Sequence, residues 1–395
     1  MTFSVSSLIK RQAIFVLYSV LVIAATTQSI LIKKKTYKEG GKTYTHYNNY
    51  VIFKQSHFHL MDSKDLYQAY PEEHWDFYKY SPTFAFCFGV LANLPDAAGL
   101  GLWNAINAFV LLISFFYLQK FSEKSRVLML AIISLELMTS MQHQESNALI
   151  TGLIILSFGL MERRKYFLAT LFIVLTIYIK LFGVVAIALF IFYPGKSKLA
   201  LYTMFWAGLL FLLPLIIVSM SQLLFLYSSW LNLILHDHSF SYGYSVMGWI
   251  HTWFNLDINK IIILVIGMAL FAIPFYRIRS YKEYSFRLFA LSSVLLWVVI
   301  FNHRAESPSF IIAISGIVIW FYSQEQSKGN NVMMITAFVA ISLLSTDLFP
   351  RVVRREFLEP YVIKAVPCIV IWIKIIYDMT FNKILRAPLS NSNNI

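Results

Sequence analysis

Runs of apolar residues recur along almost the whole chain and are separated by short polar segments. The first apolar run covers residues 13–32. Eleven more runs follow, at 98–119, 127–141, 147–162, 166–180, 181–194, 199–220, 260–276, 287–301, 308–323, 331–346 and 360–379. A transmembrane helix needs about 20 mainly apolar residues. The pattern therefore predicts an all-α polytopic membrane protein, with about 12 transmembrane helices in a single integral membrane domain over residues 1–395.

One further apolar stretch, at residues 82–94, is shorter and ends at Pro95 and Asp96. We expect residues 82–96 to form a juxtamembrane helix within a first extracytoplasmic loop at 33–97. With the N-terminus inside, about half of the 33 Lys and Arg residues then fall in short inner loops, as the positive-inside rule requires. The first outer loop disagrees, because it begins with three Lys, but it is long. The sequence thus predicts a multi-pass protein of the plasma (inner) membrane with cytoplasmic N- and C-termini.

The same topology places the short polar segments on one side of the membrane. The outer segments contain most of the acidic residues and most of the His; they are 33–97, 142–146, 221–259, 302–307 and 347–359. Ionisable residues next to a membrane are costly and usually serve a function. We therefore expect a polar site over the outer face of an apolar helix bundle.

The composition excludes several classes of protein. The chain is 58% hydrophobic, 17% aromatic and 13% charged, which is unlike a soluble or a disordered protein. Its net charge of +13 would suggest nucleic-acid binding in a soluble chain, but basic cytoplasmic loops explain it here. We expect the lipid bilayer as a partner, and no nucleic acid. Cys87 and Cys368 lie in apolar stretches and lack the spacing of a metal site.

Two outer segments combine residue types that suit sugar chemistry. The first outer loop mixes aromatic residues with five acids between Asp62 and Asp76. Aromatic rings stack on sugars or anchor at the interface, and carboxylates accept protons from hydroxyl groups. An interfacial aromatic belt would explain the Tyr and Trp residues better than the acids. The second segment, 142–147, reads Gln-His-Gln-Glu-Ser-Asn between two apolar runs, and a simple turn rarely needs Gln, His and Glu together.

Two basic residues are candidates for binding an anion. Lys180 lies between two apolar runs with no acid nearby in the sequence. Such a residue either binds a group such as phosphate or extends to the lipid head groups. Arg304, in the segment 302–307, can hold a phosphate through two hydrogen bonds or pair with Glu306.

Two other polar segments indicate solvated loops. The run His236-Asp237-His238 resembles a metal-ligand pattern, but this spacing alone is weak, so a bound divalent metal is not favoured. In the loop 347–359, three basic residues precede two acidic ones, a combination typical of an exposed, salt-bridged face; they are Arg351, Arg354, Arg355, Glu356 and Glu359.

Four short motifs occur in an order that resembles a known family. They are Tyr78-Lys79-Tyr80-Ser81-Pro82-Thr83-Phe84-Ala85 with the following Leu94-Pro95 and Leu102-Trp103; His143-Gln144-Glu145-Ser146-Asn147; Lys180; and Ser307-Pro308. They are similar to the Y-x-Y-P-P-x-F-A, G-Q-x-N, K-P and S-P motifs of glycosyltransferase family 87, in the GT-C class of membrane enzymes. One residue is inserted in the second motif, and Leu181 replaces the proline of the third. The motifs are short, so the resemblance, from residue 47 to about 310, rests on their order and spacing.

The resemblance implies a GT-C-like bundle and an inverting sugar transfer on the extracytoplasmic side. It implies a polyprenyl-phosphate-linked sugar, mannose-like, as donor, a glycan or glycolipid as acceptor, and no cofactor. The family's general base is an Asp near the start of the first outer loop, where this chain has Asn48-Asn49-Tyr50, and an amide cannot act as a base. We therefore predict Asp65, in the family-like Asp65-Leu66-Tyr67, as the base, with Asp62 and Glu145 as further catalytic candidates.

The remaining predicted site residues bind the substrates, with Lys180 and Arg304 on the leaving phosphate. They are Asn49, Tyr67, Tyr80, Gln144, Asn147, Lys180, His303, Arg304 and Glu306. Two other functions stay open at this point. A transporter or flippase for a lipid-linked solute would need more polar residues within the spans than Glu136 and a few Ser and Thr. A non-catalytic scaffold in envelope assembly would tolerate substitution of Lys180 and Asp65.

Overall fold

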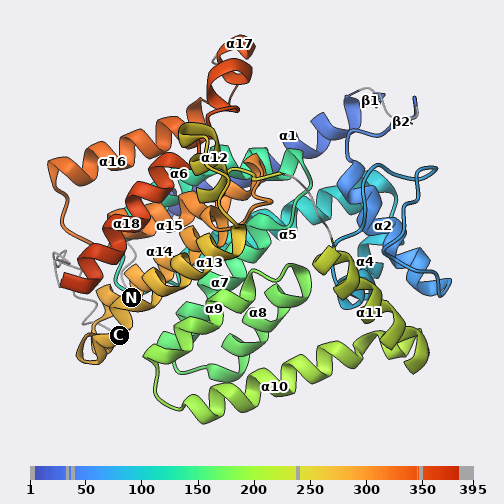
Figure 1. Cartoon of the computed structure of the whole chain (residues 1–395), viewed down its shortest axis with the longest axis horizontal. Helices are drawn as coiled ribbons and strands as arrows, with labels where there is room; N and C mark the ends of the chain where they lie inside the picture. The colour runs from blue at the N-terminus through green and yellow to red at the C-terminus, as the bar shows by residue number, and fades with distance from the viewer. Residues whose placement is uncertain are drawn as a thin grey trace.

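The computed structural model describes residues 5–32, 35–36, 41–236, 241–344, 346 and 350–381. Within these ranges the chain is almost entirely helical, with one small antiparallel ribbon (Figure 1). The α-helices are α1 (Val5–Leu31), α2 (Asn48–Met61), α3 (Pro82–Cys87), α4 (Gly89–Ala92), α5 (Asp96–Tyr117), α6 (Glu123–Gln142), α7 (Asn147–Glu162), α8 (Tyr166–Ile179), α9 (Gly183–Ala186), α10 (Lys196–Leu212), α11 (Met220–His236), α12 (Val246–Phe254), α13 (Lys260–Ala272), α14 (Tyr284–Ile300), α15 (Phe310–Tyr322), α16 (Lys328–Phe338), α17 (Arg351–Val353) and α18 (Val366–Phe381). The strands are β1 (Lys35–Thr36) and β2 (Thr43–Tyr44), and the other helical turns are η1 (Ile187–Phe192), η2 (Leu213–Ile216), η3 (Ile273–Tyr276), η4 (Ile278–Lys282), η5 (Ser307–Ser309), η6 (Val339–Leu343) and η7 (Arg354–Leu358).

The apolar runs of the sequence form helices, with ends that differ from the predicted ones by a few residues in most cases. α7 has the predicted bounds. Among the described residues, three helical segments are long and apolar enough to cross a membrane, namely Lys10–Leu31, Asp96–Tyr117 and Lys196–Ile216. Seven shorter apolar helices of 10–17 residues accompany them. The all-α class is confirmed, and the number of about 12 spans stays a prediction.

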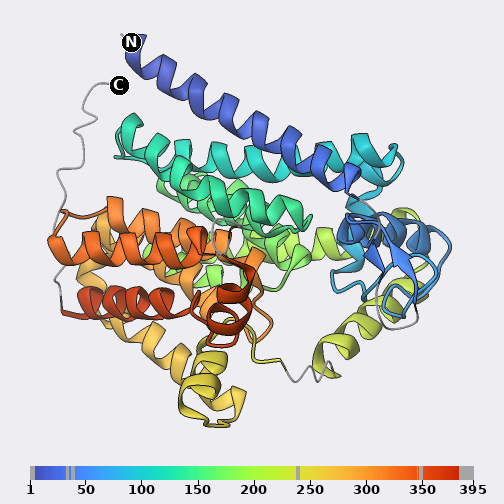
Figure 2. The ribbon, with the colours of Figure 1, turned by 90° about the horizontal axis from the view of Figure 1, so that it is seen from above.

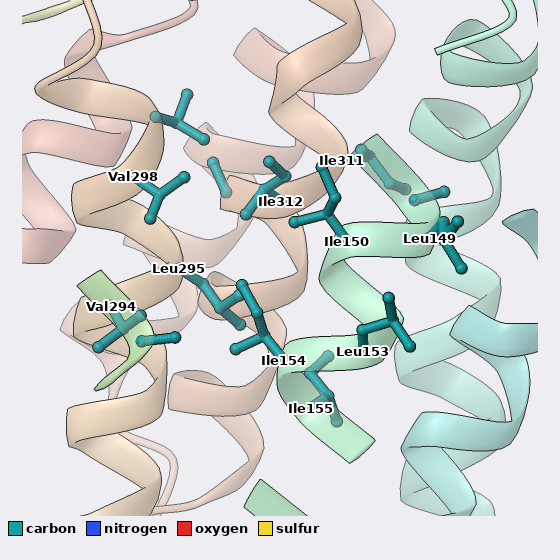
Figure 3. Packing of buried hydrophobic residues seen from close by; sticks show 14 of the residues in the cluster. Leu149, Ile150, Leu153, Ile154, Ile155, Val294, Leu295, Val298, Ile311 and Ile312 are labelled. Carbon is teal, nitrogen blue, oxygen red and sulfur yellow. The ribbon is translucent and has the colours of Figure 1, made fainter. Parts of the chain in front are cut away.

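Helix α7 forms the centre of the bundle. Every residue from Asn147 to Met161 is buried, and the helix packs against α5, α8, α14 and α15. Figure 3 shows Ile150 and Ile154 of α7 facing the aliphatic side chains of α14 and α15. At Gly152, a Cβ atom would lie 2.8 Å from the backbone of Leu111, so α5 and α7 approach closely only because this residue is glycine. This close packing fixes the position of α7.

The helix ends next to the segments predicted to be cytoplasmic contact one another at one end of the bundle. Arg287 binds the carboxylate of Glu162 through two hydrogen bonds of 2.6 and 2.7 Å. Arg277 donates to the carbonyl of Met379 at 3.3 Å. The start of α1 and the end of α18 lie at this end as well (Figure 2).

The segments predicted to be extracytoplasmic contact one another at the other end. Asn49 Nδ2 donates to the carbonyl of His143 at 2.8 Å, and the N–H of Tyr244 donates to the carbonyl of Ala305 at 2.8 Å. The polar segments at 33–97, 142–146, 221–259 and 302–307 thus share one end, as the sequence analysis expects. Which side of the membrane this end faces stays a prediction.

Residues 82–96 do not form the single juxtamembrane helix expected from the sequence. α3 begins where the Ser81 hydroxyl accepts a hydrogen bond from the N–H of Phe84, and it ends at Cys87. The short α4 follows, and α5 begins at Asp96. At Gly89 a Cβ atom would lie 2.4 Å from the ring of His57. The segment therefore breaks into two short helices that pack closely against α2.

Three helices of nine or more residues in the outer segments have no counterpart in the predicted pattern. α2 lies in the first outer loop, and α11 and α12 lie within 221–259. α11 covers the first outer loop, because Gln222 Nε2 donates to the carbonyl of Ser63 at 2.8 Å and Trp230 Nε1 to that of Lys79 at 3.1 Å. Its other face exposes Leu224, Phe225, Leu231 and Leu235. This distribution is typical of a helix at a membrane interface.

Candidate functional site

The segment His143–Asn147 connects α6 to the buried α7. The N–H of Glu145 donates to the carbonyl of Ser140 at 3.1 Å, and Gln144 has a left-handed backbone with φ of 53°. The Trp103 indole of α5 donates to the carbonyl of Gln144 at 2.9 Å. A non-glycine residue with this φ is held in place only by such surrounding contacts. The turn is therefore rigid, and it presents Glu145 and Asn147 at the start of α7.

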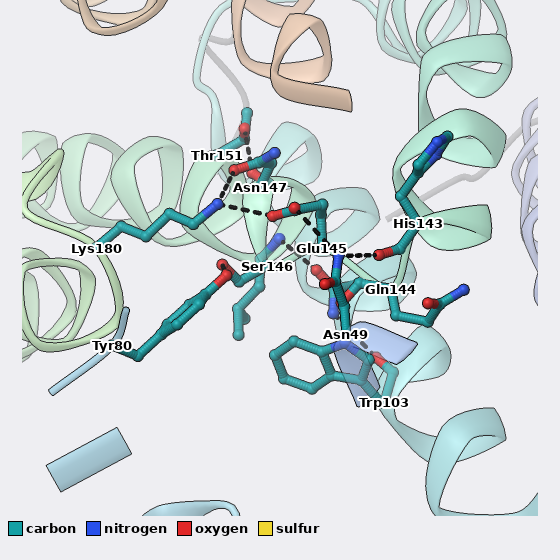
Figure 4. Close-up of polar contacts among 12 residues, drawn as sticks. Asn49, Tyr80, Trp103, His143, Gln144, Glu145, Ser146, Asn147, Thr151 and Lys180 are labelled. Carbon is teal, nitrogen blue, oxygen red and sulfur yellow. Dashed lines mark hydrogen bonds and ion pairs between the residues drawn. The ribbon is translucent and has the colours of Figure 1, made fainter. Parts of the chain in front are cut away.

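Lys180 binds this turn from the end of α8. Its ammonium group lies 2.7 Å from Glu145 Oε2 and donates to Asn147 Oδ1 at 3.2 Å. The three side chains point toward one another in Figure 4. The side chains of Lys180 and Glu145 keep 24% and 16% of their surface exposed, so the pair borders solvent without being screened like a surface pair. The acid that the sequence analysis did not find near Lys180 is thus Glu145.

Asn49, at the start of α2, reaches the same turn from the first outer loop. Its Nδ2 donates to the carbonyl of His143 at 2.8 Å and lies 3.4 Å from Glu145 Oε1. The two oxygens of the Glu145 carboxylate therefore have different partners. Asn49, near the position where the resemblance implies an acidic base, thus lies beside Glu145 with an amide side chain.

Tyr80 and Tyr67 extend the cluster toward α3. The hydroxyl of Tyr80 lies 3.2 Å from Ser146 Oγ, and Lys180 Nζ lies 5.5 Å from the centre of its ring. Burial raises the pKa of the Tyr80 hydroxyl to about 12, although nearby Lys180 opposes the shift. Tyr67 is also buried, and its hydroxyl donates to the carbonyl of Tyr80 at 2.9 Å. Tyr80 thus borders the site, and Tyr67 holds its backbone.

Gln144 contacts a different part of the molecule. Its side chain is buried and donates to Ser29 Oγ of α1 at 3.3 Å. In this structure it stabilises the turn, and a direct role in substrate binding stays a prediction.

The segment 302–307 brings Glu306 close to the cluster. Burial among the surrounding segments and the nearby Glu145 carboxylate raise the pKa of Glu306, and Lys180 opposes this shift. The side chain nevertheless keeps exposed surface. Its neighbours include Asp76 and Lys79 of the first outer loop, two residues that the sequence analysis did not include in the site.

Arg304 and His303 lie in the same segment, next to residues 241–245. The N–H of Arg304 donates to Asn302 Oδ1 at 3.0 Å. A Cβ atom at Gly243, where φ is +55°, would lie 2.6 Å from the carbonyl oxygen of His303. The close approach of the two segments therefore requires glycine at position 243. The roles predicted for His303 and Arg304 stay predictions.

Asp62 and Asp65 lie at the far end of α2. This helix has 14 residues and is therefore about 20 Å long, and Asn49 is at its other end. Asp62 is exposed and lies 2.9 Å from Lys64. Both carboxylate oxygens of Asp65 lie 3.0 Å from Ser229 Oγ of α11. The structure thus does not bring either acid to the Lys180–Glu145 pair, and their catalytic roles stay predictions.

A cavity of about 780 Å³ lies on the other side of the 142–147 turn. It is lined by residues of α6, η5, η6 and the segment 354–364. Arg354 and Arg355 contribute to this lining. Arg355 is exposed and Arg354 lies 4.0 Å from Glu359, and the solvated, salt-bridged face expected at 347–359 stays a prediction. Residue 347 lies outside the described residues, and so does Asp237 of the His-Asp-His run.

A buried ion pair that the sequence analysis missed lies at the edge of this cavity. Lys364 Nζ lies 3.1 Å from Glu136 Oε2 and donates to Ser307 Oγ at 2.8 Å. Both charged side chains are almost completely buried. The available signal was a lysine inside an apolar run, the same signal that identified Lys180. Among the described residues, no group of three or more His, Cys, Asp or Glu side chains is arranged to hold a metal ion.

The comparisons with known proteins give one match. The sequence model of glycosyltransferase family 87 matches residues 77–346, which is more than half of the chain. The match includes Tyr80, the 142–147 turn, Lys180 and Glu306, whereas Asn49 and Asp65 precede it. A search of curated proteins finds no match. The family assignment favours the enzyme hypothesis over the transporter and the scaffold. The chain belongs to glycosyltransferase family 87 and is a membrane enzyme that transfers a sugar from a donor to an acceptor.

Proposed function

We propose that the protein transfers a mannose-like hexose from a polyprenyl-phosphate carrier to an extracytoplasmic glycan or glycolipid, with inversion at the anomeric carbon. The observation that supports this most directly is the meeting of the first outer loop, the 142–147 turn and the end of α8 around the Lys180–Glu145 pair. The polar groups meet at one end of an apolar bundle, where the head group of a lipid-linked donor would lie. A carrier of this kind brings its own leaving group, so no nucleotide-binding loop is needed.

In an inverting transfer, a carboxylate removes the proton of the acceptor hydroxyl as its oxygen attacks the anomeric carbon. The bond from this carbon to the carrier phosphate breaks, and the phosphate leaves with the electron pair. We assign the base to Glu306, because its raised pKa favours accepting a proton and its side chain remains accessible to an acceptor. Asp65, predicted from the sequence, is the alternative base.

We assign Glu145, Lys180 and Asn147 to positioning the hydroxyl groups of the sugar. Glu145 already offsets the charge of Lys180 at 2.7 Å, so a second anion would gain less from this lysine than from a basic group without such a partner. The pair still offers a donor and an acceptor side by side, which matches neighbouring hydroxyls of a hexose. Tyr80 adds an aromatic ring against which a sugar face can pack.

The test is a transfer assay with the full-length protein in nanodiscs and a panel of labelled polyprenyl-phosphate hexoses and pentoses. Release of polyprenyl phosphate and labelling of membrane glycolipid acceptors are measured together. We expect transfer with at least one hexose donor, and its loss in Lys180→Met and Glu306→Gln. Lys54→Met is the matched control, because Lys54 pairs with Asp96 at the same distance of 2.7 Å outside the cluster. A folded wild-type protein that transfers no sugar from any donor of the panel would disprove the proposal.

The variant Asp65→Asn decides between the two candidate bases. If Asp65 has only its structural contact with Ser229, the variant retains most of the activity. If Asp65→Asn loses transfer and Glu306→Gln retains it, the base is Asp65.

A further inference from the structure

The cavity beside the 142–147 turn has one basic wall and one apolar wall. The basic groups are Arg354, Arg355 and Lys364, which all come from the segment between α17 and α18 (Figure 1). The apolar wall consists of Leu135, Met138, Ala340, Leu344, Leu358 and Ile363. The cavity has a volume of about 780 Å³, which lies within the range of ordinary ligand pockets. A ligand that fits both walls has a negative group attached to a hydrocarbon chain.

The basic wall has positive charge to offer such a ligand. Glu136 already offsets the charge of Lys364. Arg354 lies 4.0 Å from Glu359, an acid that also lines the cavity and offsets part of the charge of Arg354. Among the described residues, Arg355 forms no ion pair, and its side chain is exposed. Arginine binds phosphate through two parallel hydrogen bonds, so two adjacent arginines suit a phosphate better than a carboxylate.

Two residues of the cavity lining are close in sequence to residues assigned to the transfer reaction. His143 lines it, and two residues further along the chain Glu145 pairs with Lys180. Ser307 lines it too, and the preceding residue is Glu306. The turn 142–147 thus has the cavity on one side and the Lys180–Glu145 pair on the other. This proximity along the chain supports a ligand whose phosphate lies in the cavity and whose attached sugar points toward Glu145 and Glu306.

We propose that this cavity binds a phosphate ester with an apolar chain, and that the two arginines hold the phosphate. Resting on the proposed function, we assign this ligand to the carrier end of the donor, so that the cavity also receives the leaving phosphate. An anionic phospholipid has the same chemistry, and the experiment distinguishes the two sources.

The test measures binding rather than transfer, with the full-length protein in zwitterionic nanodiscs. Three probes are used: a polyprenyl phosphate without sugar, the matching polyprenol, and phosphatidylglycerol, each followed by native mass spectrometry and by the shift in unfolding temperature. The variants are Arg355→Gln and the double variant Arg354→Gln/Arg355→Gln. Arg279→Gln is the matched control, because Arg279 is an exposed arginine at the opposite end of the bundle.

We expect polyprenyl phosphate to bind and polyprenol not to bind. We expect Arg355→Gln to weaken binding about tenfold, the double variant about 100-fold, and Arg279→Gln not to change it. Equal affinity of the wild type and the double variant, or equal binding of polyprenol, would overturn the inference. If phosphatidylglycerol binds in an arginine-dependent way and polyprenyl phosphate does not, the assignment to the donor carrier is overturned.

The failure of this inference can be told from the failure of the proposed function. Glu306→Gln should bind polyprenyl phosphate as the wild type does and yet not transfer sugar. Arginine-dependent binding without transfer from any donor would refute the proposed function and leave the cavity assignment standing. Sugar transfer by the wild type, together with unchanged binding of polyprenyl phosphate in the arginine variants, would refute the cavity assignment and leave the proposed function standing.

Discussion

The ammonium group of Lys180 lies 2.7 Å from the carboxylate of Glu145, although the two residues are 35 positions apart and belong to different connections between helices. Asn147 binds the same ammonium group, and Asn49 approaches the other oxygen of the carboxylate. Four polar residues from three segments thus depend on one ion pair. This arrangement allows specific tests of function and stability.

Replacing Lys180 by Met should abolish transfer and destabilise the protein moderately. The substitution leaves the Glu145 carboxylate and the Asn147 amide without their partner, which costs about 1 to 3 kcal/mol in free energy of unfolding. Transfer and chemical denaturation of the same preparation provide the two measurements. The double variant Lys180→Met/Glu145→Gln is the control. It should recover part of the stability but none of the transfer. Recovery of both would mean that the pair is structural.

Replacing Glu306 by Gln should lower kcat/KM by about 100- to 10,000-fold, the usual contribution of a general base. A base must be ionised, so activity of the wild type should rise with pH as Glu306 loses its proton. Because the pKa of Glu306 is raised, this rise should occur at a higher pH than for an ordinary glutamate. The pH profile of kcat/KM measures this rise. The residual activity of Glu306→Gln should not show it. If the rise of activity with pH is unchanged in the variant, it reports the titration of another group.

Replacing Asn49 by Asp should reduce activity rather than restore a family-like base. The new carboxylate would face the Glu145 carboxylate at about the present distance of 3.4 Å, and the donor to the His143 carbonyl would be lost. We expect a loss of about 1 to 3 kcal/mol in free energy of unfolding together with reduced transfer. Asn93→Asp is the control, because Asn93 donates to the carbonyl of Gly89 at 2.8 Å away from the site. Higher transfer in Asn49→Asp would show that position 49 can hold the base.

Replacing Lys364 by Met should destabilise the protein strongly. Glu136 would keep a buried charge without a partner, and breaking a buried ion pair in this way costs about 3 to 5 kcal/mol. The measurement is the denaturation midpoint in detergent or nanodiscs. The double variant Lys364→Met/Glu136→Leu should regain most of the loss, since no buried charge remains. A neutral single variant would indicate that water reaches the pair.

Cysteine labelling should show that the first outer loop and the segment 302–307 face the same side of the membrane. In a Cys87→Ser background, we expect a membrane-impermeant reagent applied from outside to label His303→Cys and Gln68→Cys. Arg279→Cys should react only after the membrane is opened. Labelling of His303→Cys and Gln68→Cys from opposite sides would contradict the predicted topology.

Helices whose positions are mostly apolar, because they face lipid or the protein interior, were predicted well from the sequence. Helices of mixed composition were predicted poorly. The run at 147–162 matches α7 because this helix is buried on all sides. α2 escaped notice because it packs Asn48, Ser56, His57 and His59 inside the protein, and such a mixture has no continuous apolar run. Residues 82–96 looked like one helix because the contact of Gly89 with His57 is a tertiary feature.

The sequence predicted which segments form the candidate site, but not how their residues are placed relative to one another. Motif order identified Lys180, Tyr80 and the 142–147 turn, which the structure brings together. It could not tell which end of α2 faces the turn, and the amide of Asn49 rather than the carboxylate of Asp65 lies there. Nor could it place Arg354 and Arg355 at a cavity, because several residues that line it with them, among them Leu135, Tyr244 and Ser307, are distant in the chain.

The turn that presents Glu145 and Asn147 is joined to α7, the helix with the least freedom to move. Substrate specificity in such an enzyme must then change at the periphery, in exposed parts of the first outer loop, where substitutions leave the central helix undisturbed. Variants that accept a new sugar acceptor should therefore arise in these outer parts while the Lys180–Glu145 pair stays the same.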